Sequence, residues 1–327
     1  MVHAFEALPK EEQEFYRKVF SGEAVAPLYS DTIAKNIFNA DVHPERLNFL
    51  LRSIARDNTI DVRSSAANEG FRQSVHAKGM VSDIPAWLKD NRLSNLEVQQ
   101  EARNYLFTRM DLYASDMLLL QYSVVPGQAK GDVDYANVSD VLLVVLMVNS
   151  PRTFKAFDKA SRHYIHRFAE RVADTGLSYP SKARIIYVQL DKCLKQFKTG
   201  KNAESADGKP DKLQRWLAMI ADANDAKVSE AIATDKELKQ IRTEVFNMAQ
   251  DKEVQNMLLQ EKFERMDWVS YGNDREREGE IEGVIKLYHD EQNLAPVIIV
   301  SKIMKRFDLT KEEAEGYVKE TLVLQSV

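Results

Sequence analysis

Two acidic residues, Asp83 and Glu97, stand in stretches that otherwise look suited to a β-sheet. Residues 76–88 and 93–99 are candidate strands, and residues 89–92 form turn material between them. If these strands pair as a hairpin, Asp83 lies opposite Glu97 only when the numbers of paired residues sum to 180, which centres the loop on Asp90. A loop centred between Asp90 and Asn91 would send the two side chains to opposite faces, unless a bulge near Pro85 corrected the register.

Two carboxylates that meet on a buried sheet repel each other, and one of them should take up a proton. A divalent cation removes this cost, because Mg²⁺ accepts oxygen ligands from two carboxylates together with a main-chain carbonyl and waters. We therefore expect Asp83 and Glu97 to hold Mg²⁺, or Mn²⁺, if they converge. The alternative is that one or both carboxylates lie in water at a sheet edge, where isolated acidic residues usually are.

The elements that must position this pair change from helical to strand periodicity along the chain. We expect a mixed α/β core in which strands alternate with helices, followed by a helical C-terminal region after a loop over residues 198–212. Residues 161–171 fit both the helix and the strand template. The other expected helices cover residues 4–20, 31–56 with a break near 41–44, and 100–124, and the other expected strands cover 59–62, 141–148 and 183–190.

Composition limits the classes of function. The formal net charge of −5 does not support bulk attraction to nucleic acid or to an anionic membrane, although a local basic face remains compatible with it. The longest apolar run, residues 141–148, is too short to span a bilayer, and the N-terminus lacks a signal-peptide core. The lone Cys193 is expected to be a buried thiol in a reducing cytosol, and no glycine-rich nucleotide loop occurs. We expect a cytoplasmic protein without a membrane segment or nucleotide cofactor.

An ordered series of motifs resembles the PD-(D/E)XK nuclease superfamily, close to its recombination-promoting nuclease / putative transposase family. Asp83 precedes Glu97-Val98-Gln99 by the spacing typical of that signature. The resemblance covers roughly residues 25–325 and extends to several further pieces in the family's order. These are YSDTIAKNIFN (29–39), ERLNFLLRSI (45–54), a helix with Arg109 and Tyr113, the strand VLLVVLMV (141–148), the strand IIYVQL (185–190) and the helix DKLQRWLAMI (211–220).

The resemblance implies a restriction-endonuclease-like mixed sheet flanked by helices. It implies three parts: an N-terminal helical extension (1–28), a nuclease-like core (29–200) and a helical C-terminal region (201–327). It further implies that Asp83, Glu97 and the carbonyl of Val98 bind the metal, and that Gln99 stands where many relatives have lysine. A glutamine amide can orient a water molecule but carries no charge and accepts no proton near neutral pH, so that catalysis could be slow or lost.

The same resemblance suggests accessory and DNA-contacting residues. Asp31 could add an acidic contact through water, and Arg109 and Tyr113 could face the phosphate backbone or simply pack the helix on the sheet. Most surface lysines and arginines bind nothing, so solvated side chains are the alternative for the basic residues. The implied DNA contacts are Lys78, Lys89, Arg92 and Arg103.

These observations predict a Mg²⁺-dependent DNA endonuclease (a hydrolase) associated with recombination or transposition. The alternatives are a catalytically inactive DNA-binding or protein-interaction member of the same fold, and a helical scaffold with exposed acids. We expect a homodimer, with the C-terminal helices as a dimerisation unit or, because of a cluster at Lys302, Lys305 and Arg306, a DNA-binding unit.

A metal site on His163 and His166 is not expected, because an i, i+3 pair diverges on a strand. Thr310 and Glu313 fit a capping box that opens a final helix.

Overall fold

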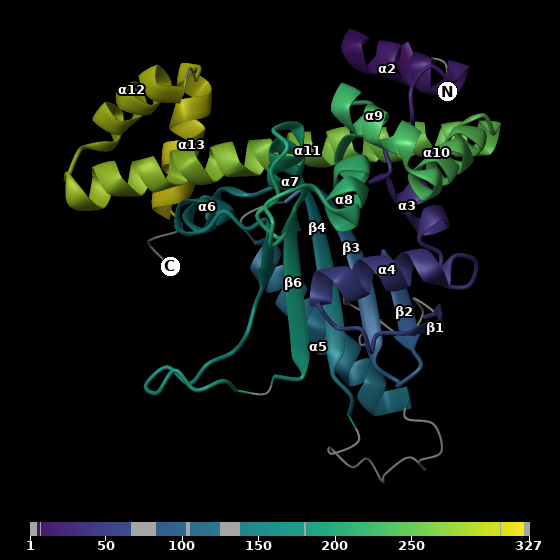
Figure 1. Ribbon diagram of the computed structural model, residues 1–327. Helices are drawn as coiled ribbons and strands as arrows, with labels where there is room; N and C mark the ends of the chain where they lie inside the picture. The colour runs from purple at the N-terminus through teal and green to yellow at the C-terminus, as the bar shows by residue number, and fades with distance from the viewer. Residues whose placement is uncertain are drawn as a thin grey trace. The chain divides into compact units, whose positions relative to one another are not determined.

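The computed structural model describes residues 5–6, 8–66, 83–102, 105–124, 138–179, 181–307 and 309–323 (Figure 1). The chain divides into two compact units, Met1–Leu258 and Leu259–Val327. The boundary falls within the long helix α11 (Lys252–Lys286). The domain boundaries expected after residues 28 and 200 stay predictions.

The first unit is built on a six-stranded mixed sheet in the order β1-β2-β3-β4-β6-β5. Strands β1, β2 and β3 form an antiparallel meander, β3, β4 and β6 are parallel, and β5 runs antiparallel to β6 at the edge. A mixed sheet flanked by helices is the fold class that the sequence predicts. The strands are β1 (Val62–Ser65), β2 (Ile84–Leu88), β3 (Leu93–Glu101), β4 (Val141–Asn149), β5 (Ile165–Arg167) and β6 (Ala183–Gln189).

Strand β4 lies at the centre because nearly all of its side chains are apolar. Residues 141–147 are all buried, as expected of a parallel strand covered on both faces. Successive side chains alternate between the faces, so that Leu143, Val145 and Met147 join one apolar cluster with Tyr187 of β6. The prediction of a buried strand over 141–148 is confirmed.

The β2–β3 hairpin has the register that brings Asp83 opposite Glu97. Ile84 pairs with Leu96 and Trp87 with Leu93, so paired residue numbers sum to 180. The loop has three residues: the main-chain N–H of Leu88 donates to the carbonyl of Arg92 (2.9 Å), and Asn91 closes the turn with a φ of +65°. Such three-residue loops end on a left-handed residue, and asparagine tolerates that conformation.

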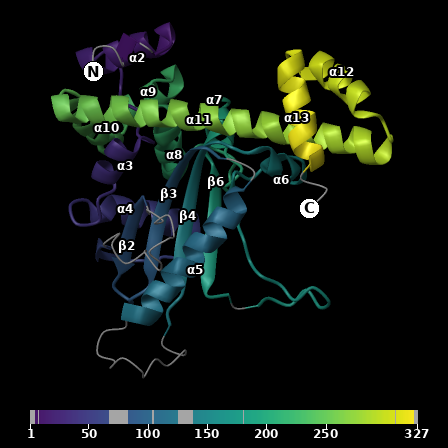
Figure 2. The same ribbon diagram turned by 180° about the vertical axis from the view of Figure 1, so that it is seen from behind.

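Helices cover both faces of the sheet in the first unit. Helix α5 (Leu106–Val124) packs on β4 and β6 on one face, and α4 (Pro44–Ala55), α7 (Leu190–Lys198) and α8 (Lys212–Asp222) lie on the other (Figures 1 and 2). A short helix, α6 (Lys155–Ala160), precedes β5. Four more helices complete the unit beside them: α2 (Lys10–Ser21), α3 (Asp31–Ile37), α9 (Ala226–Thr234) and α10 (Lys236–Ala249).

Two local expectations differ from the structure. The helix expected from residue 100 begins at Leu106, because β3 continues to Glu101 beside β4. The strand expected over 59–62 starts at Val62, because the Asp57 carboxylate accepts hydrogen bonds from Thr59 and holds a turn there. The ambiguous stretch 161–171 contains strand β5, while residues 76–82 of the expected strand lie outside the described residues.

In the second unit, the end of α11 is followed by a π-helical turn (Leu287–Glu291), α12 (Pro296–Phe307) and α13 (Lys311–Val323). The Thr310 main-chain N–H donates to the Glu313 carboxylate (2.8 Å), and the Glu313 N–H donates to the Thr310 hydroxyl (3.3 Å), which confirms the capping box. The unit has its own apolar core of Ile281, Ile285, Ile299, Ile303, Ala314 and Val318.

Among the described residues of either unit, no helix is both long and apolar enough to cross a membrane.

Candidate metal site on strands β2 and β3

The carboxylates of Asp83 and Glu97 converge where the β2–β3 pairing ends. Asp83 directly precedes β2, and its main-chain N–H donates to the Glu97 carboxylate (N to Oε1, 3.1 Å). In return, the N–H of Val98 donates to the Asp83 carboxylate (N to Oδ2, 2.8 Å). Each carboxylate is thus held by a main-chain N–H group from across the β2–β3 pairing, which fixes both side chains.

A row of polar side chains runs along one face of β3. Asn95, Glu97 and Gln99 alternate with apolar Leu96 and Val98, so the three polar groups share a face. The Asn95 amide donates to Glu97 Oε1 (2.7 Å), and the Gln99 amide donates to Glu97 Oε2 (3.3 Å). Both oxygens of Glu97 therefore accept hydrogen bonds from neighbours on its own strand.

Helix α5 connects this row to a positive charge. Arg109 donates one hydrogen bond to Gln99 Oε1 (3.0 Å) and two to the Tyr113 hydroxyl (2.8 and 3.3 Å). The chain Tyr113–Arg109–Gln99–Glu97 fixes which end of the Gln99 amide points at the carboxylate. Arg109 and Tyr113 therefore help to pack α5 on the sheet and also bring a positive charge to the site.

The acids are unfavourably placed for holding two negative charges. Burial, the neighbouring Glu97 and the Asp31 carboxylate raise the pKa of Asp83 well above its usual range, although the Val98 N–H and Lys35 act in the opposite direction. Part of the Asp83 residue reaches solvent, but its carboxyl group is enclosed by protein. Because both pKa values are raised, the pair is expected to bind a proton when no cation is present.

Glu97 itself is fully buried, and burial is the main cause that raises its pKa. The hydrogen bonds from Asn95 and from the Asp83 N–H counteract this shift. Burial opposes charge on Arg109 as well, but its hydrogen bond to Tyr113 and the nearby acids Glu97 and Asp83 outweigh burial and raise its pKa. Arg109 is therefore a permanent cation at the site.

Helix α3 brings a third carboxylate and a lysine near this pair. Ser30 caps the helix by accepting a hydrogen bond from the Ile33 N–H, which places Asp31 in the first turn. Lys35 lies one turn later and forms an ion pair with Asp31 (4.0 Å). Both side chains act on the pKa of Asp83, so the structure brings Asp31 into the electrostatic neighbourhood of the Asp83–Glu97 pair.

The donor set fits a divalent cation. Two carboxylates that repel each other in an enclosed space are hard oxygen ligands in need of positive charge. The Val98 carbonyl points to the same side of β3 as its N–H, which donates to Asp83, because both groups of one residue face the same neighbouring strand. Within the described part of the chain, no three His, Cys, Asp or Glu side chains come together as a metal site. A cation would therefore complete its ligand shell with the carbonyl and waters.

The residues expected to contact DNA do not gather at this site. Lys89 and Arg92 lie at the hairpin turn, at the other end of β2 and β3, and both form ion pairs: Lys89 with Asp61 (2.7 Å) and Arg92 with Asp57 (3.1 Å). Lys78 and Arg103 lie outside the described residues. The DNA contacts of all four stay predictions.

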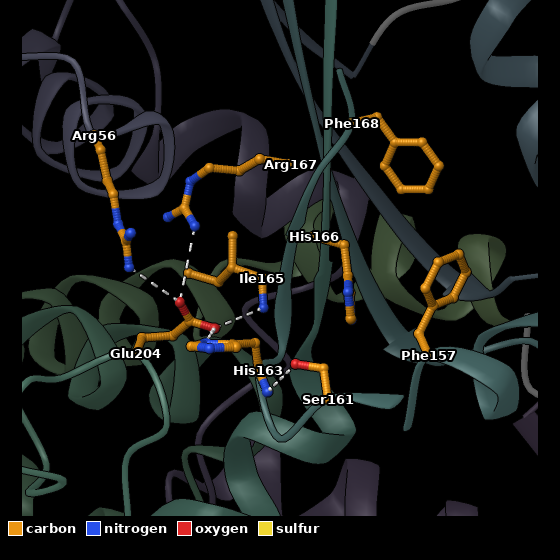
Figure 3. Close-up of a pocket in the computed structure, with 9 residues that line it drawn as sticks. All are labelled: Arg56, Phe157, Ser161, His163, Ile165, His166, Arg167, Phe168 and Glu204. Atoms are coloured by element: carbon orange, nitrogen blue, oxygen red, sulfur yellow. Dashed lines mark hydrogen bonds and ion pairs between the residues drawn. The ribbon is translucent and has the colours of Figure 1, made fainter. Parts of the chain in front are cut away.

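A separate pocket of about 390 Å³ lies beside strand β5 (Figure 3). The carboxylate of Glu204 reaches into it and accepts hydrogen bonds from the main-chain N–H groups of Tyr164 and Ile165, both at 3.1 Å. Arg56 pairs with the same carboxylate (3.5 Å). The groups in this pocket that would attract an anion are thus already engaged by the Glu204 carboxylate. These contacts hold the 199–211 loop on the sheet.

The two histidines of this region diverge, as expected on a strand. His163 contacts Glu204 (3.2 Å), whereas the ring of His166 points to the other side of β5 and contacts Gln189 (2.7 Å) (Figure 3).

Sequence reasoning missed two members of the site. Asn95 is fully buried and orients Glu97, and its amide oxygen also accepts the N–H of Ile84 (3.3 Å). Its signal in the sequence is a third polar residue in step with Glu97 and Gln99 on an otherwise apolar strand. Lys35 affects the pKa of Asp83 from a helix 48 residues away in the sequence, and nothing local to either strand indicates this.

Comparison with known protein families gives one match over this region. Residues 29–274 match the family model described as PD-(D/E)XK nuclease family transposase. The match spans the sheet, the two acids and α5, and extends into the α11 helix. No curated protein and no solved structure matches the chain.

Proposed function

The chain belongs to the family of PD-(D/E)XK nuclease family transposases, and from this premise we propose that it is a Mg²⁺-dependent DNA endonuclease. The observation that carries the proposal is the opposition of Asp83 and Glu97, two enclosed carboxylates whose pKa values are both raised. A protein that only needed a stable sheet would gain by replacing this pair with apolar residues. Retention of such a pair is typical of functional sites.

In this proposal Asp83, Glu97 and the Val98 carbonyl hold the cation. A divalent cation bound there would supply a Lewis acid for the scissile phosphate and for an attacking water. The chain's own part is to fix the ligands: Asn95 and the Asp83 N–H orient Glu97, and the Val98 N–H orients Asp83. Mn²⁺ has the same preference for oxygen ligands and would substitute for Mg²⁺.

Gln99 has a positioning role in this proposal rather than that of a base. Its amide oxygen accepts from Arg109 and its amide N–H donates to Glu97, so both ends are engaged within the protein. Arg109 then supplies a positive charge beside the pair from α5, and a planar guanidinium suits a phosphate oxygen. Asp31 and Lys35 flank the pair from α3.

The same observation supports a second candidate, an inactive member of the family that binds DNA or a protein. Gln99 is uncharged and engaged within the protein, so it cannot accept a proton from the attacking water once both acids bind a cation. Such a protein would bind Mg²⁺ without cleaving DNA. As part of the endonuclease proposal, we propose that the enzyme acts in recombination or transposition in the cytoplasm.

Plasmid nicking with and without Mg²⁺, run beside calorimetric titration with Mg²⁺ and Mn²⁺, tests both candidates. We expect metal-dependent nicking by the full chain, and its loss in the Asp83→Ala/Glu97→Ala double variant with unchanged circular dichroism. Asp140→Asn is a matched control, because Asp140 is an exposed acid that precedes the opposite end of β4. Nicking by the double variant would refute the endonuclease proposal, and turnover by the wild type would refute the inactive one.

A further inference from the structure

The outer face of α5 carries a row of exposed apolar side chains. Tyr105, just before the helix, and Leu112 and Leu119 within it are 47%, 57% and 48% exposed. They recur every seven residues, and the small exposed residues Thr108 and Ser115 lie between them. We call these five residues the α5 stripe; its spacing is that of the contact positions of a helix pair.

The α5 stripe is separate from the face that packs on the sheet. Met110, Ala114 and Met117 bury the inner side of the helix against β4 and β6. A surface helix normally places charged residues opposite its buried face, whereas a helix that is apolar on two sides is normally covered on both. Figure 2 shows α5 lying across the sheet, with no helix or strand from the described residues of the first unit in front of it.

Charge is nearly missing from the exposed side of α5. Of the five exposed positions within residues 106–121, Asp111 alone is charged. Arg109 is turned toward Gln99 and Tyr113, and Asp116 is buried. For comparison, α10 carries Lys236, Glu237, Lys239, Arg242 and Glu244 in fourteen residues. Depletion of charge around exposed aromatic and apolar side chains is typical of the core of a protein interface.

We propose that a second copy of this chain packs on the α5 stripe, with the two α5 helices antiparallel across a two-fold axis at Leu112. The stripe is symmetric about that residue, since Tyr105 and Leu119 each lie seven positions away. The axis therefore places Leu112 against its own copy and Tyr105 against Leu119 of the other chain. Such self-complementarity is what an isologous dimer requires, and the small Thr108 and Ser115 allow a close approach.

The surface beside the α5 stripe provides the additional area that a dimer needs. Stable interfaces bury roughly 800 Å² on each partner, more than a row of five side chains supplies. A groove of about 820 Å³ lies next to the stripe, lined by Asp111 and Ser115 of α5 and by Phe168 and Tyr179 of the segment that follows β5. Phe168 and Tyr179 are 43% and 59% exposed, which continues the apolar surface along the groove.

In the second unit, Val297 and Ile298 at the start of α12 are 81% and 47% exposed. Ile299 and Ile303 of the same helix are buried against Ala314 and Val318 of α13. We assign the dimer contact to α5 rather than to the C-terminal helices because the exposed apolar row of α5 is symmetric about Leu112. Since Arg109 and Tyr113 lie on the same helix, assembly would also hold these two side chains in place.

Cysteine cross-linking of the full chain tests the two-fold axis directly. Cys193 is fully buried and is the only cysteine, so the Leu112→Cys variant has a single accessible thiol, close to its copy across the axis. We expect mild oxidation to convert most of this variant to a covalent dimer. The Val42→Cys variant is the matched control, because Val42 is 64% exposed on a distant turn, and it should stay monomeric on denaturing gels. Equal cross-linking of both variants would overturn the proposal.

Sedimentation equilibrium supplies an independent measurement. Leu112→Glu and Leu119→Glu should each weaken the dimer at least about 100-fold, because a two-fold interface would bury two unpaired carboxylates. Val42→Glu should leave the association unchanged, and circular dichroism should report a native fold for all three, since each site is exposed. A wild type that stays monomeric at about 100 μM, or dimers that survive both stripe substitutions, would refute the α5 interface.

Discussion

Replacement of Asp83 by asparagine should stabilise the metal-free protein and abolish its response to Mg²⁺. Asparagine keeps an oxygen that can accept the Val98 N–H, so the structural hydrogen bond is retained. It removes the charge that Glu97 and Asp31 oppose. Proteins commonly gain stability when a strained functional group is neutralised, at the cost of activity.

The size of the effect follows from the repulsion between two like charges in contact. Two unit charges about 4 Å apart near a protein surface repel by roughly 4 kcal/mol. A proton bound by the pair already relieves much of this repulsion, so we expect a net gain of about 1–3 kcal/mol in the free energy of unfolding. For a unit of this size, each kcal/mol shifts the Tm by about 2–4 °C.

The gain should depend on pH in a defined direction. Because the folded-state pKa of Asp83 is raised, its protonated form stabilises the protein fully below the unfolded pKa, near 4. This contribution is lost as the pH rises through the raised folded value. The Asp83→Asn variant should therefore match the wild type near pH 4 and exceed it progressively toward pH 8.

Thermal unfolding at pH 4, 6 and 8, with and without Mg²⁺, measures both effects. Mg²⁺ at about 100 times its Kd should stabilise the wild type by about 2.7 kcal/mol and leave Asp83→Asn unchanged. At pH 8, the stability advantage of Asp83→Asn over the wild type should therefore shrink or reverse when Mg²⁺ is added. A lower Tm for the metal-free variant would refute the reasoning, because Asp83 would then be a structural cap of β3 rather than a strained ligand.

Three further outcomes follow from the structure. Arg109→Met should lower nicking at least 10-fold, whereas Arg109→Lys should retain part of it, because lysine keeps the charge but not the planar fork; initial rates on plasmid DNA measure this. Arg46→Met should cost about 1.5–3 kcal/mol in urea unfolding, because the buried Arg46 guanidinium donates two charged hydrogen bonds to the partly exposed Glu244 (2.7 and 2.8 Å); a cost near zero would contradict the pairing. Thr310→Ala should destabilise the second unit by about 1 kcal/mol, measured by hydrogen exchange in α13, and Thr234→Ala is the control.

Local patterns in the sequence determined most of the elements and the two acids. The continuous apolar run over 141–148 could only be a strand covered on both faces, and Lys89-Asp90-Asn91 suits a three-residue loop. That loop decided whether Asp83 meets Glu97, and the sequence left both registers open. The reason is physical: a change of one residue in loop length alters the energy of the turn little but moves every side chain to the other face.

Tertiary structure alone decided the surroundings of the acids. Lys35 and Arg109 come from helices on either side of the hairpin in the sequence, and their approach to Asp83 and Gln99 depends on how those helices dock. The pKa values of Asp83 and Glu97 are set by enclosure and by this docking, which no residue type encodes by itself. The sequence by itself therefore determined which groups could do chemistry, and packing decided which of them share one site, because burial and distance arise only when the elements come together.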